Sequence, residues 1–457
     1  MPQPSHKSLL LIAYAFPPFA GSGAHRNLRF AKYLSELHWE ISVLSAKSLH
    51  FRPGTPVDEE LLSHIPSGVA IERTSVRRPL DALLRLRTLF RRKGANRNQG
   101  VPRPKVSGGP QGPAPAKGLK DFISAVLSFP DAEVGWVPGA VLKGMALIRN
   151  RGIRLLFSSG PPHSCHLVGW ALKAIARVPW VADFRDPWTR RPWLDSVAQA
   201  SWSHRGKVFL ERKIVAAADL VILNTEEARE EFAAFYTHES PHKFVALSNG
   251  YNPASQPILK ETMPSKRVFK AVHAGSFYKK RNPLGLLKAL RELISEKRLD
   301  PKDIHIRFIG PCEVQEVQAE MEALALEACV EWIPWLDHRR CMEAMAASDL
   351  LLLIQPGTHL QIPGKVFEYV MLKKKILALT GPGATANLIR KYDLGAVVDP
   401  SDVGGIKTVL LQFIEKQRQN DGLSEGYLRA LDVFNAESLS KALDAHLVRI
   451  LERQEKA

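Results

Sequence analysis

Short apolar runs and amphipathic stretches alternate along most of the chain. The first half opens with the apolar run SLLLIAYAF, continues with the helically periodic stretch AHRNLRFAKYLSEL, and then gives a second apolar run, EISVLSA. The second half repeats this alternation from VFKAVHAGSF to GAVVDP. Apolar strands that alternate with amphipathic helices are typical of parallel sheets covered on both faces. The sequence therefore predicts an α/β protein with two doubly wound, Rossmann-like domains.

A stretch without helical or strand periodicity separates the two alternating regions. It covers residues 251–268 and is rich in Pro, Ser and Asn, which is typical of a linker. We therefore expect an N-terminal domain at residues 1–250 and a C-terminal domain at residues 269–428. A last amphipathic stretch, residues 429–457, has no neighbouring strand and could pack back on the N-terminal domain.

Two doubly wound domains that face one another form a cleft between the carboxyl ends of their sheets. Open α/β folds bind ligands at these strand ends, so we expect functional side chains on the loops that follow strands. The rest of the composition is that of an ordinary globular protein. The four cysteines form no CxxC pair and show no zinc-type spacing with histidine, which predicts neither a disulfide framework nor a metal, and a reducing cytosol is expected. The first apolar run breaks at Pro17 and Pro18 and indicates a strand rather than a signal peptide.

Positive charge is concentrated in one segment. The chain has 63 Lys and Arg against 46 Asp and Glu, a net charge of +17, and most of the excess falls within residues 73–120. This insert contains RRPLDALLRLRTLFRRK, a basic amphipathic helix candidate, followed by a Pro- and Gly-rich stretch that is typical of disorder. The insert is either a solvated insertion or a helix attracted to an anionic membrane surface. Nucleic-acid binding is disfavoured because the segment matches no recognisable DNA-binding module.

Two loops of the N-terminal domain carry candidate residues. Gly21 and Gly23 follow the first strand and open a helix, so they form either a ligand-facing loop or a plain tight turn. FSSGPPHSCH places His163 and His166 just beyond a buried strand. A histidine in that position can transfer a proton or bind a sugar hydroxyl, although a structural role is the alternative for each.

The segment WVADFRDPW is the third candidate of this domain. Asp183 and Asp186 flank Arg185 at the end of a strand. An arginine between the two carboxylates favours internal pairing over binding of a metal ion, and we expect no metal. Two interpretations stay open, namely a wall of the cleft that recognises a hydroxylated ligand and a structural ion-paired turn.

The C-terminal domain has a basic loop after its first strand, AGSFYKKRNP. Gly275 relieves crowding in this loop, and Arg281 offers a planar fork that matches phosphate, so the loop is either a phosphate site or a plain basic surface turn. Further along, HLQIPGKVFEYVML places Gly364, Lys365 and Glu368 at the start of a helix. Lys365 and Glu368 share one face and form either a surface salt bridge or a clamp, with Lys365 on a diphosphate and Glu368 on the ribose hydroxyls.

Six segments together resemble the GT-B glycosyltransferases of family four, which act in bacterial surface polysaccharide synthesis. These segments are AYAFPPFAGSGAHRNLRFAKYL, FSSGPPHSCHLVGW, PWVADFRDPW, LSNGYNP, HAGSFYKKRNP and PGKVFEYVMLKKKILAL. The resemblance implies a retaining transferase that needs no metal or cofactor, with a nucleotide sugar held mainly by the second domain and the acceptor by the first. It places Arg281 where the family has its diphosphate-binding Lys. It places Glu368 where the family has the ribose-binding second Glu of a Glu, seven residues, Glu pattern.

The chain departs from the family pattern at two positions. The family's phosphate-binding Arg falls on Ser276, so Lys365 is expected to supply a positive charge in its place. The first Glu of the pair falls on Leu360, which cannot hydrogen-bond the donor sugar and leaves the identity of that sugar open.

The expected function is transfer of a sugar from a nucleotide sugar, with UDP favoured, to a lipid-linked or polysaccharide acceptor. His163, His166, Arg281, Lys365 and Glu368 are the candidate catalytic residues. The expected location is the cytoplasm, and the membrane interpretation of the basic insert adds the inner face of the plasma membrane as an alternative. A nucleotide-sugar epimerase of the same fold and a non-catalytic nucleotide-sugar-binding protein are the alternatives.

Overall fold

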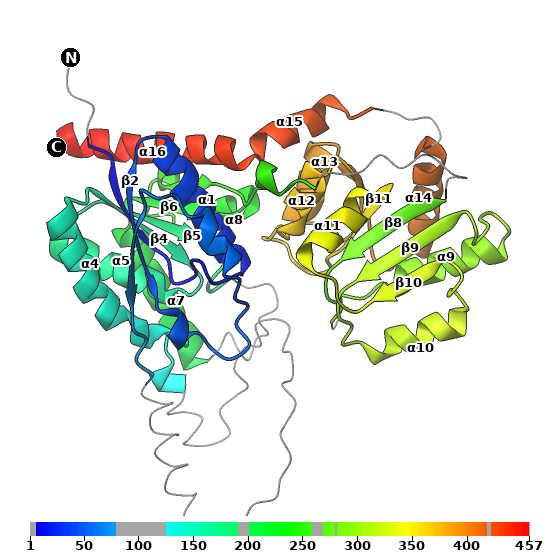
Figure 1. Ribbon diagram of the computed structural model, residues 1–457, viewed down its shortest axis with the longest axis horizontal. Helices are drawn as coiled ribbons and strands as arrows, with labels where there is room; N and C mark the ends of the chain where they lie inside the picture. Colours follow the sequence, from blue (N-terminus) through cyan, green and yellow to red (C-terminus); the bar gives the residue numbers. More distant parts are fainter. Residues whose placement is uncertain are drawn as a thin grey trace, which may run out of the picture. The chain divides into compact units, whose positions relative to one another are not determined.

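The chain forms two compact units in a computed structural model (Figure 1). The model describes residues 6–78, 125–190, 201–257, 268–278, 281–417 and 422–456. Unit 1 comprises residues 1–248 and 440–457, and unit 2 comprises residues 249–439. Most of the predicted basic insert, from residue 79 onward, lies outside the described residues, as do residues 258–267 of the predicted linker.

Unit 1 is built on a seven-stranded parallel sheet with the order β3-β2-β1-β4-β5-β6-β7. Its apolar runs are buried on both faces, as in β1, where every residue of SLLLI is buried. The strand order reverses between β1 and β4, which creates the position where doubly wound folds bind ligands. The strands are β1 Ser8–Ile12, β2 Glu40–Ala46, β3 Ala70–Thr74, β4 Leu155–Gly160, β5 Trp180–Phe184, β6 Leu220–Leu223 and β7 Phe244–Ala246.

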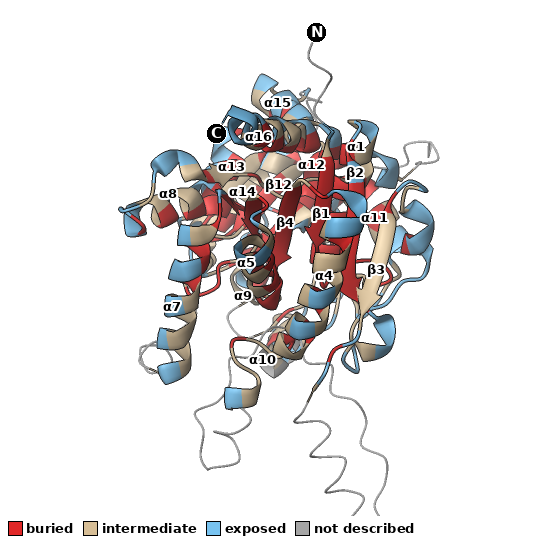
Figure 2. Ribbon diagram, turned by 90° about the vertical axis from the view of Figure 1, so that its left-hand side faces the viewer, coloured by how far each residue is buried: buried red, intermediate tan, exposed pale blue. Residues whose placement is uncertain are grey.

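Helices cover the sheet of unit 1, and Figure 2 shows β1 and β4 buried, β3 at the sheet edge partly buried, and the helices with exposed outer faces. The α-helices are α1 Ser22–Glu36, α4 Val137–Arg151, α5 Ser164–Ala176, α7 Trp202–Ala217 and α8 Glu226–Phe235. Short 3-10 helices lie in the connections of both units: η1 Ser48–His50, η2 Glu60–His64, η3 Val134–Trp136, η4 Pro241–Lys243 and η5 Pro253–Ser255.

The last helix, α16 (Ala436–Lys456), contributes its residues from Ser440 onward to unit 1. Its apolar face is buried there through Leu443, Leu447 and Leu451. Asp444 accepts hydrogen bonds from Lys7 Nζ at 3.0 Å and from the indole nitrogen of Trp39 at 2.7 Å. The end of the chain is therefore part of the unit that contains its beginning.

Unit 2 has a six-stranded parallel sheet with the order β10-β9-β8-β11-β12-β13. Its order reverses between β8 and β11, and apolar clusters cover both faces. The strands are β8 Phe269–Ala274, β9 Ile304–Ile309, β10 Val330–Ile333, β11 Leu350–Ile354, β12 Lys375–Leu379 and β13 Gly395–Val398. The helices are α9 Leu284–Ser295, α10 Gln315–Leu324, α11 His338–Ala346, α12 Lys365–Met371, α13 Ala384–Lys391, α14 Val403–Gln417 and α15 Glu425–Val433. Two parallel doubly wound sheets confirm the predicted α/β class.

Candidate functional site

A pocket of about 420 Å³ lies in unit 1, at the carboxyl ends of β1, β4 and β5. Four of the predicted site residues line it, namely Gly21, Gly23, His163 and Arg185. They come from three different loops after strands, which is where the parallel sheet was expected to gather them. The pocket brings together the glycine loop, one of the two histidines and the arginine of WVADFRDPW.

The glycine loop packs tightly against its neighbours. Gly21 is the residue before the first turn of α1, and a Cβ added there would collide with the Phe19 ring. A Cβ at Gly23 would lie 3.3 Å from the guanidinium carbon of Arg185. Arg185 in turn donates a hydrogen bond to Ser22 Oγ at 2.6 Å and forms an ion pair with Asp186 at 3.0 Å. Small residues at both positions let the start of α1 and the arginine lie together at the edge of the pocket.

Asp183 lies below the pocket rather than on its wall. Both its carboxylate oxygens accept from the Arg26 guanidinium, at 2.8 and 3.0 Å, and Ser159 Oγ donates to it at 2.8 Å. Arg26 also donates to the carbonyl oxygens of Leu247 and Ser248, at 2.8 and 2.9 Å. This bidentate pair is fully buried, so the geometry of Asp183 is that of a structural ion pair. Its partner is Arg26 and not the neighbouring Arg185.

The two predicted histidines differ in position. His163 lines the pocket, and its ring stacks on Trp188 with the ring centroids 4.6 Å apart. His166 is fully buried beneath it, with Nδ1 2.9 Å from Ser158 Oγ and its ring stacked on Phe184. Burial lowers the pKa of His166 to about 3, so this ring is neutral near pH 7. Only His163 is placed to touch a ligand in the pocket.

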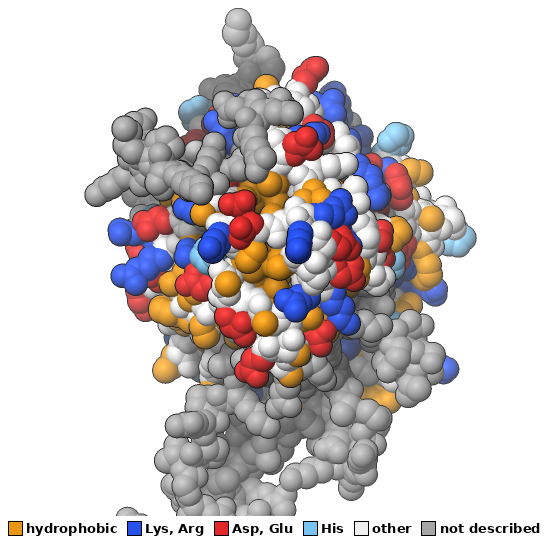
Figure 3. Space-filling view, turned by 90° about the vertical axis from the view of Figure 1, so that its right-hand side faces the viewer, with side chains coloured by type: hydrophobic (Ala, Val, Ile, Leu, Met, Phe, Trp, Pro, Cys, Tyr) orange, Lys and Arg blue, Asp and Glu red, His pale blue; other side chains and the backbone are white. Residues whose placement is uncertain are grey.

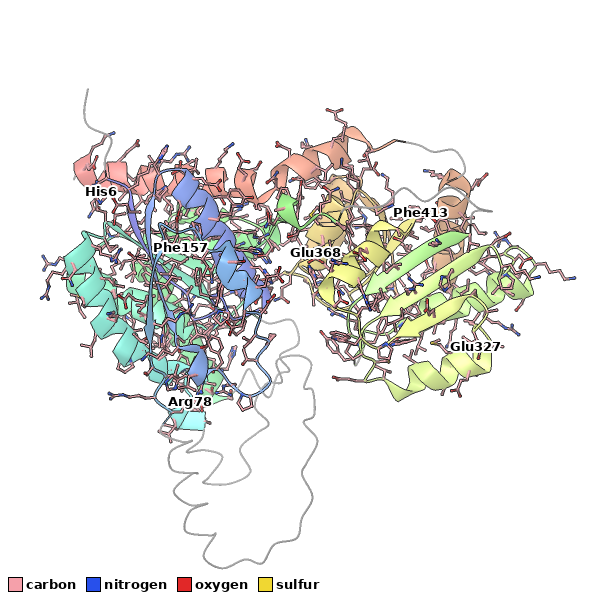
Figure 4. The ribbon with its side chains drawn as sticks, viewed as in Figure 1. His6, Arg78, Phe157, Glu327, Glu368 and Phe413 are labelled. Carbon is pink, nitrogen blue, oxygen red and sulfur yellow. The ribbon has the colours of Figure 1, made fainter. Side chains whose placement is uncertain are left out.

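Among the pocket residues that sequence reasoning missed are Tyr14, Asp131 and Glu133. Glu133 accepts from the Tyr14 hydroxyl at 2.9 Å and pairs with Arg78 and Arg52, both at 2.7 Å. Figure 4 labels Arg78 on the side of unit 1 where this cluster lies. The only sequence signal is the spacing of two carboxylates in PDAEVGW, directly before a helix.

Asp131 adjoins Glu133 in this cluster. It accepts from the backbone N–H and the hydroxyl of Ser164, both at 2.7 Å, and from the backbone N–H of Glu133 at 2.9 Å. Burial raises the pKa of Asp131 against the effect of these hydrogen bonds. A pocket with carboxylate oxygens and the aromatic rings of Tyr14 and Phe19 suits a hydroxylated ligand, because carboxylates accept from hydroxyl groups.

A second group of predicted residues comes together in unit 2, at the carboxyl ends of β8 and β11. Lys365, the first residue of α12, reaches across to Gly275 and donates to the carbonyl oxygen of Ala274. Gly275 has a φ of 151°, which residues with a Cβ rarely adopt, and a Cβ there would displace Lys365 Nζ. Burial, reinforced by the charge of Arg281, lowers the pKa of Lys365 to about 8, although the Glu368 carboxylate acts in the opposite direction.

Arg281 follows the same loop and donates to the side-chain oxygen of Gln355, the residue after β11. Its guanidinium carbon lies 5.0 Å from the centre of the Tyr278 ring. Ser276 directly follows Gly275 in this loop, and Gly364 precedes the first turn of α12. Two cations and a glycine loop at the end of a parallel strand make an arrangement suited to a phosphate group.

Glu368 lies on α12 one turn after Lys365 and is labelled in Figure 4. Its charge acts on Lys365 from the same helix face, as the sequence spacing predicted. Within the described parts of the chain, no group of three or more His, Cys, Asp or Glu residues is placed to hold a metal ion. Independence from metal stays a prediction.

Comparison with known proteins places the fold. No protein-family model and no curated protein sequence matches the chain. Among solved structures, sucrose-phosphate synthase from Thermosynechococcus elongatus matches with a TM-score of 0.65 at 12% identity, covering 98% of this chain and 100% of that one. HepE from Anabaena in complex with UDP-glucose matches with a TM-score of 0.59 at 16% identity, covering 97% and 99%.

WaaG, a glycosyltransferase involved in lipopolysaccharide biosynthesis, matches with a TM-score of 0.55 at 14% identity, covering 95% of this chain and 98% of that one. A structure described as a UDP-N-acetylglucosamine 2-epimerase from Listeria monocytogenes shares the fold as well. The predicted two-domain GT-B fold is therefore confirmed, and membership of family four in particular stays a prediction. A shared fold does not separate a transferase from an epimerase.

Proposed function

We propose that the protein is a retaining glycosyltransferase that moves a sugar from a nucleotide sugar, with UDP favoured, to a lipid-linked or polysaccharide acceptor. The observation that carries this proposal is the approach of Lys365 to Gly275 at the strand-order reversal of unit 2, with the charge of Arg281 close enough to lower the pKa of Lys365. Doubly wound domains bind nucleotides at this position, and the cations match a diphosphate.

The chemistry follows from where charge develops. When the bond between sugar and diphosphate breaks, negative charge grows on the phosphate oxygens and positive charge on the sugar ring. Lys365 and Arg281 stabilise the departing diphosphate at the point where that charge appears. Glu368 accepts hydrogen bonds from the two ribose hydroxyls, since an ionised carboxylate only accepts. The acceptor hydroxyl attacks from the same face as the leaving group, which retains the configuration of the sugar.

The acceptor binds in the pocket of unit 1 in this proposal. Glu133 and Asp131 hold acceptor hydroxyls, while the rings of Tyr14 and Phe19 pack against the acceptor. His163 is the pocket histidine placed to hydrogen-bond the attacking hydroxyl. His166 acts from below by supporting the β4 loop, because its ring is buried.

A thermal-shift experiment with UDP, GDP and UDP-glucose tests the donor site. We expect the protein to be stabilised by at least one of these nucleotides and Glu368→Ala to lose that stabilisation. Native protein that responds to none of them would rule out both the transferase and the epimerase. Product analysis with the stabilising donor then separates the alternatives: transfer or slow donor hydrolysis indicates a transferase, an epimeric sugar nucleotide indicates an epimerase, and neither indicates a binding protein.

We also propose that unit 1 attaches to an anionic membrane surface near the basic insert, residues 73–120. Three apolar side chains are exposed close to where the described chain resumes: Val126 at 46%, Trp202 at 44% and Phe209 at 59%. Phe129 contacts Trp202 with the ring centroids 5.8 Å apart, so residues just beyond the insert adjoin the start of α7. Exposed aromatic rings beside basic residues are typical of surfaces that enter the membrane interface.

One face of unit 2 is shown in Figure 3. Acidic and basic side chains are interspersed on it, with scattered hydrophobic ones among the residues drawn in colour. In the described portion of the chain, no helix is long and apolar enough to cross a membrane. Sedimentation with vesicles containing phosphatidylglycerol tests the proposal: deletion of residues 79–118, which keeps the pair of Arg78 with Glu133, should reduce binding, and unchanged binding would contradict a role of the insert.

A further inference from the structure

A buried histidine lies beside the proposed phosphate site of unit 2. His273 stands next to the end of β8, and its side chain is fully buried. Its Nδ1 lies 2.9 Å from the carbonyl oxygen of Leu352 in β11, and its ring stacks on Phe277. Because a carbonyl oxygen can only accept, Nδ1 carries the proton and donates to it. In the neutral ring, Nε2 is therefore the nitrogen with a free lone pair.

Nε2 of His273 lies near Gly275 and the end of the Lys365 side chain. It has no hydrogen-bond partner among the described residues, although it is buried. A Cβ added at Gly275 would lie 3.4 Å from this nitrogen, and the same Cβ would collide with Lys365 Nζ. The imidazole nitrogen and the lysine ammonium thus approach one spot from two different elements. A buried polar atom without a partner is unfavourable, and an oxygen of a bound phosphate would supply the missing partner.

The charged groups around His273 keep its ring neutral while the site is empty. Lys365 reaches it from α12 and Arg281 from the loop after β8, and both are cations. The hydroxyl of Tyr369, which is also on α12, donates to the same Leu352 carbonyl at 3.2 Å. The Phe308 ring of β9 packs against His273 from the neighbouring strand. Burial first, and then the two cations, hold the pKa of His273 well below its usual value.

We propose that His273 is a third ligand of the donor diphosphate and takes up a proton when the diphosphate binds. This inference rests on the proposed donor site. Two phosphate charges beside Nε2 offset the repulsion from Lys365 and Arg281 and favour the imidazolium. The proton comes from solvent and sits on Nε2, which then donates to a phosphate oxygen, while Nδ1 keeps its bond to Leu352. The step forms the Nε2–H bond at the expense of an O–H bond of the solvent, and no other covalent bond changes.

His273 acts here as a ligand of the diphosphate and not as an acid or base on the sugar. As the sugar leaves, the diphosphate gains negative charge, and a donor fixed at Nε2 by the Leu352 bond strengthens its hold at that moment. The consequence is a site that binds the donor more tightly at lower pH. Because the complex holds one more proton on His273 than the free protein, binding becomes weaker as the pH rises above the pKa of the free imidazole.

Isothermal titration calorimetry with UDP-glucose measures the uptake directly. UDP-glucose is the probe because its phosphates carry fixed charges near neutral pH. Titrations at pH 6.5 in PIPES and in imidazole, two buffers of different ionisation enthalpy, give the number of protons bound per ligand. We expect about one proton per UDP-glucose for the native protein. Lys365 contributes little at this pH because its pKa is about 8.

Two substitutions at His273 and one control complete the test. His273→Asn keeps an amide donor for the Leu352 carbonyl and removes Nε2, and His273→Gln places a neutral amide near the Nε2 position. Both should lose the proton uptake, with Gln retaining more affinity than Asn. His305→Asn, the same change in the neighbouring strand β9, should take up the proton as the native protein does.

The outcomes separate this inference from the proposed function. Native protein that binds UDP-glucose without proton uptake overturns the role of His273, as does uptake that persists in both His273 variants. Native protein that binds neither UDP-glucose nor UDP overturns the donor site itself and the inference with it. Circular dichroism of the two variants checks that a lost uptake is not a lost fold.

Discussion

The guanidinium of Arg26 holds the carboxylate of Asp183 with two nitrogens, at 2.8 and 3.0 Å, and both side chains are buried. Removal of one partner leaves an uncompensated buried charge, which costs about 3–5 kcal/mol. We therefore expect Arg26→Met to lower the free energy of unfolding of unit 1 by that amount in urea titrations. Arg229→Met, which breaks a surface pair with Glu226, should cost about 1 kcal/mol or less. A loss of similar size in both variants would contradict a structural role for Asp183.

Glu368 should contribute to nucleotide binding through the ribose. A hydrogen bond to a charged group contributes about 1.5–3 kcal/mol, so Glu368→Gln should weaken UDP binding by roughly 10- to 100-fold. In the native protein, 2′-deoxy-UDP should bind more weakly than UDP, and in Glu368→Gln the two ligands should bind alike. Calorimetric titration measures both. Glu343→Gln on α11, which pairs with Arg339 on the surface, is the matched control and should bind UDP normally.

The ammonium of Lys365 should set an upper pH limit for binding. With a pKa of about 8 in the free protein, Lys365 is charged below that pH and neutral above it. A diphosphate binds the charged form, so binding above this pH must first restore a proton, and UDP affinity falls by up to about tenfold per pH unit. Arginine keeps its charge throughout this range. Lys365→Arg should therefore lose less affinity than the native protein between pH 8 and 10, and parallel losses would argue against Lys365 as a phosphate ligand.

Gly275 should be intolerant of any side chain. Its φ of 151° lies in a region that residues with a Cβ rarely adopt, and a Cβ there would collide with Lys365 Nζ. Gly275→Ala should cost about 1–3 kcal/mol of stability and weaken UDP binding by displacing Lys365. Gly152→Ala, at the end of α4 with a φ of 59° and open space around it, should cost stability alone. Normal UDP binding in Gly275→Ala would show that the space beside Gly275 is not used.

The sequence could indicate which residues lie together because they follow the strands of parallel sheets. Gly21, His163 and Arg185 are far apart in the chain, yet each follows a parallel strand, and parallel strands end at one edge of the sheet. The same logic placed Arg281 and Lys365 together in unit 2. The apolar runs predicted the α/β class because strands buried on both faces of a parallel sheet are apolar at successive positions, as β1 is.

Pairings between distant residues could not be predicted in this way. Tyr14 and Glu133 are 119 positions apart, and Arg26 and Asp183 are 157 apart, so no local pattern connects them. The two histidines of GPPHSCH looked equivalent in the sequence. The start of α5 turns His163 toward the pocket and buries His166 against Phe184, a difference that depends on side-chain packing.

The last helix has a consequence for how the protein is made. Leu443, Leu447 and Leu451 fill part of the core of unit 1, and Asp444 holds Lys7 and Trp39 near the first strands. On the ribosome, residues 1–248 emerge first but lack this cover until α16 has left the exit tunnel. The core of unit 1 therefore stays without its α16 cover while unit 2 is synthesised. Unit 1 is the first unit to begin synthesis and the last to be completed.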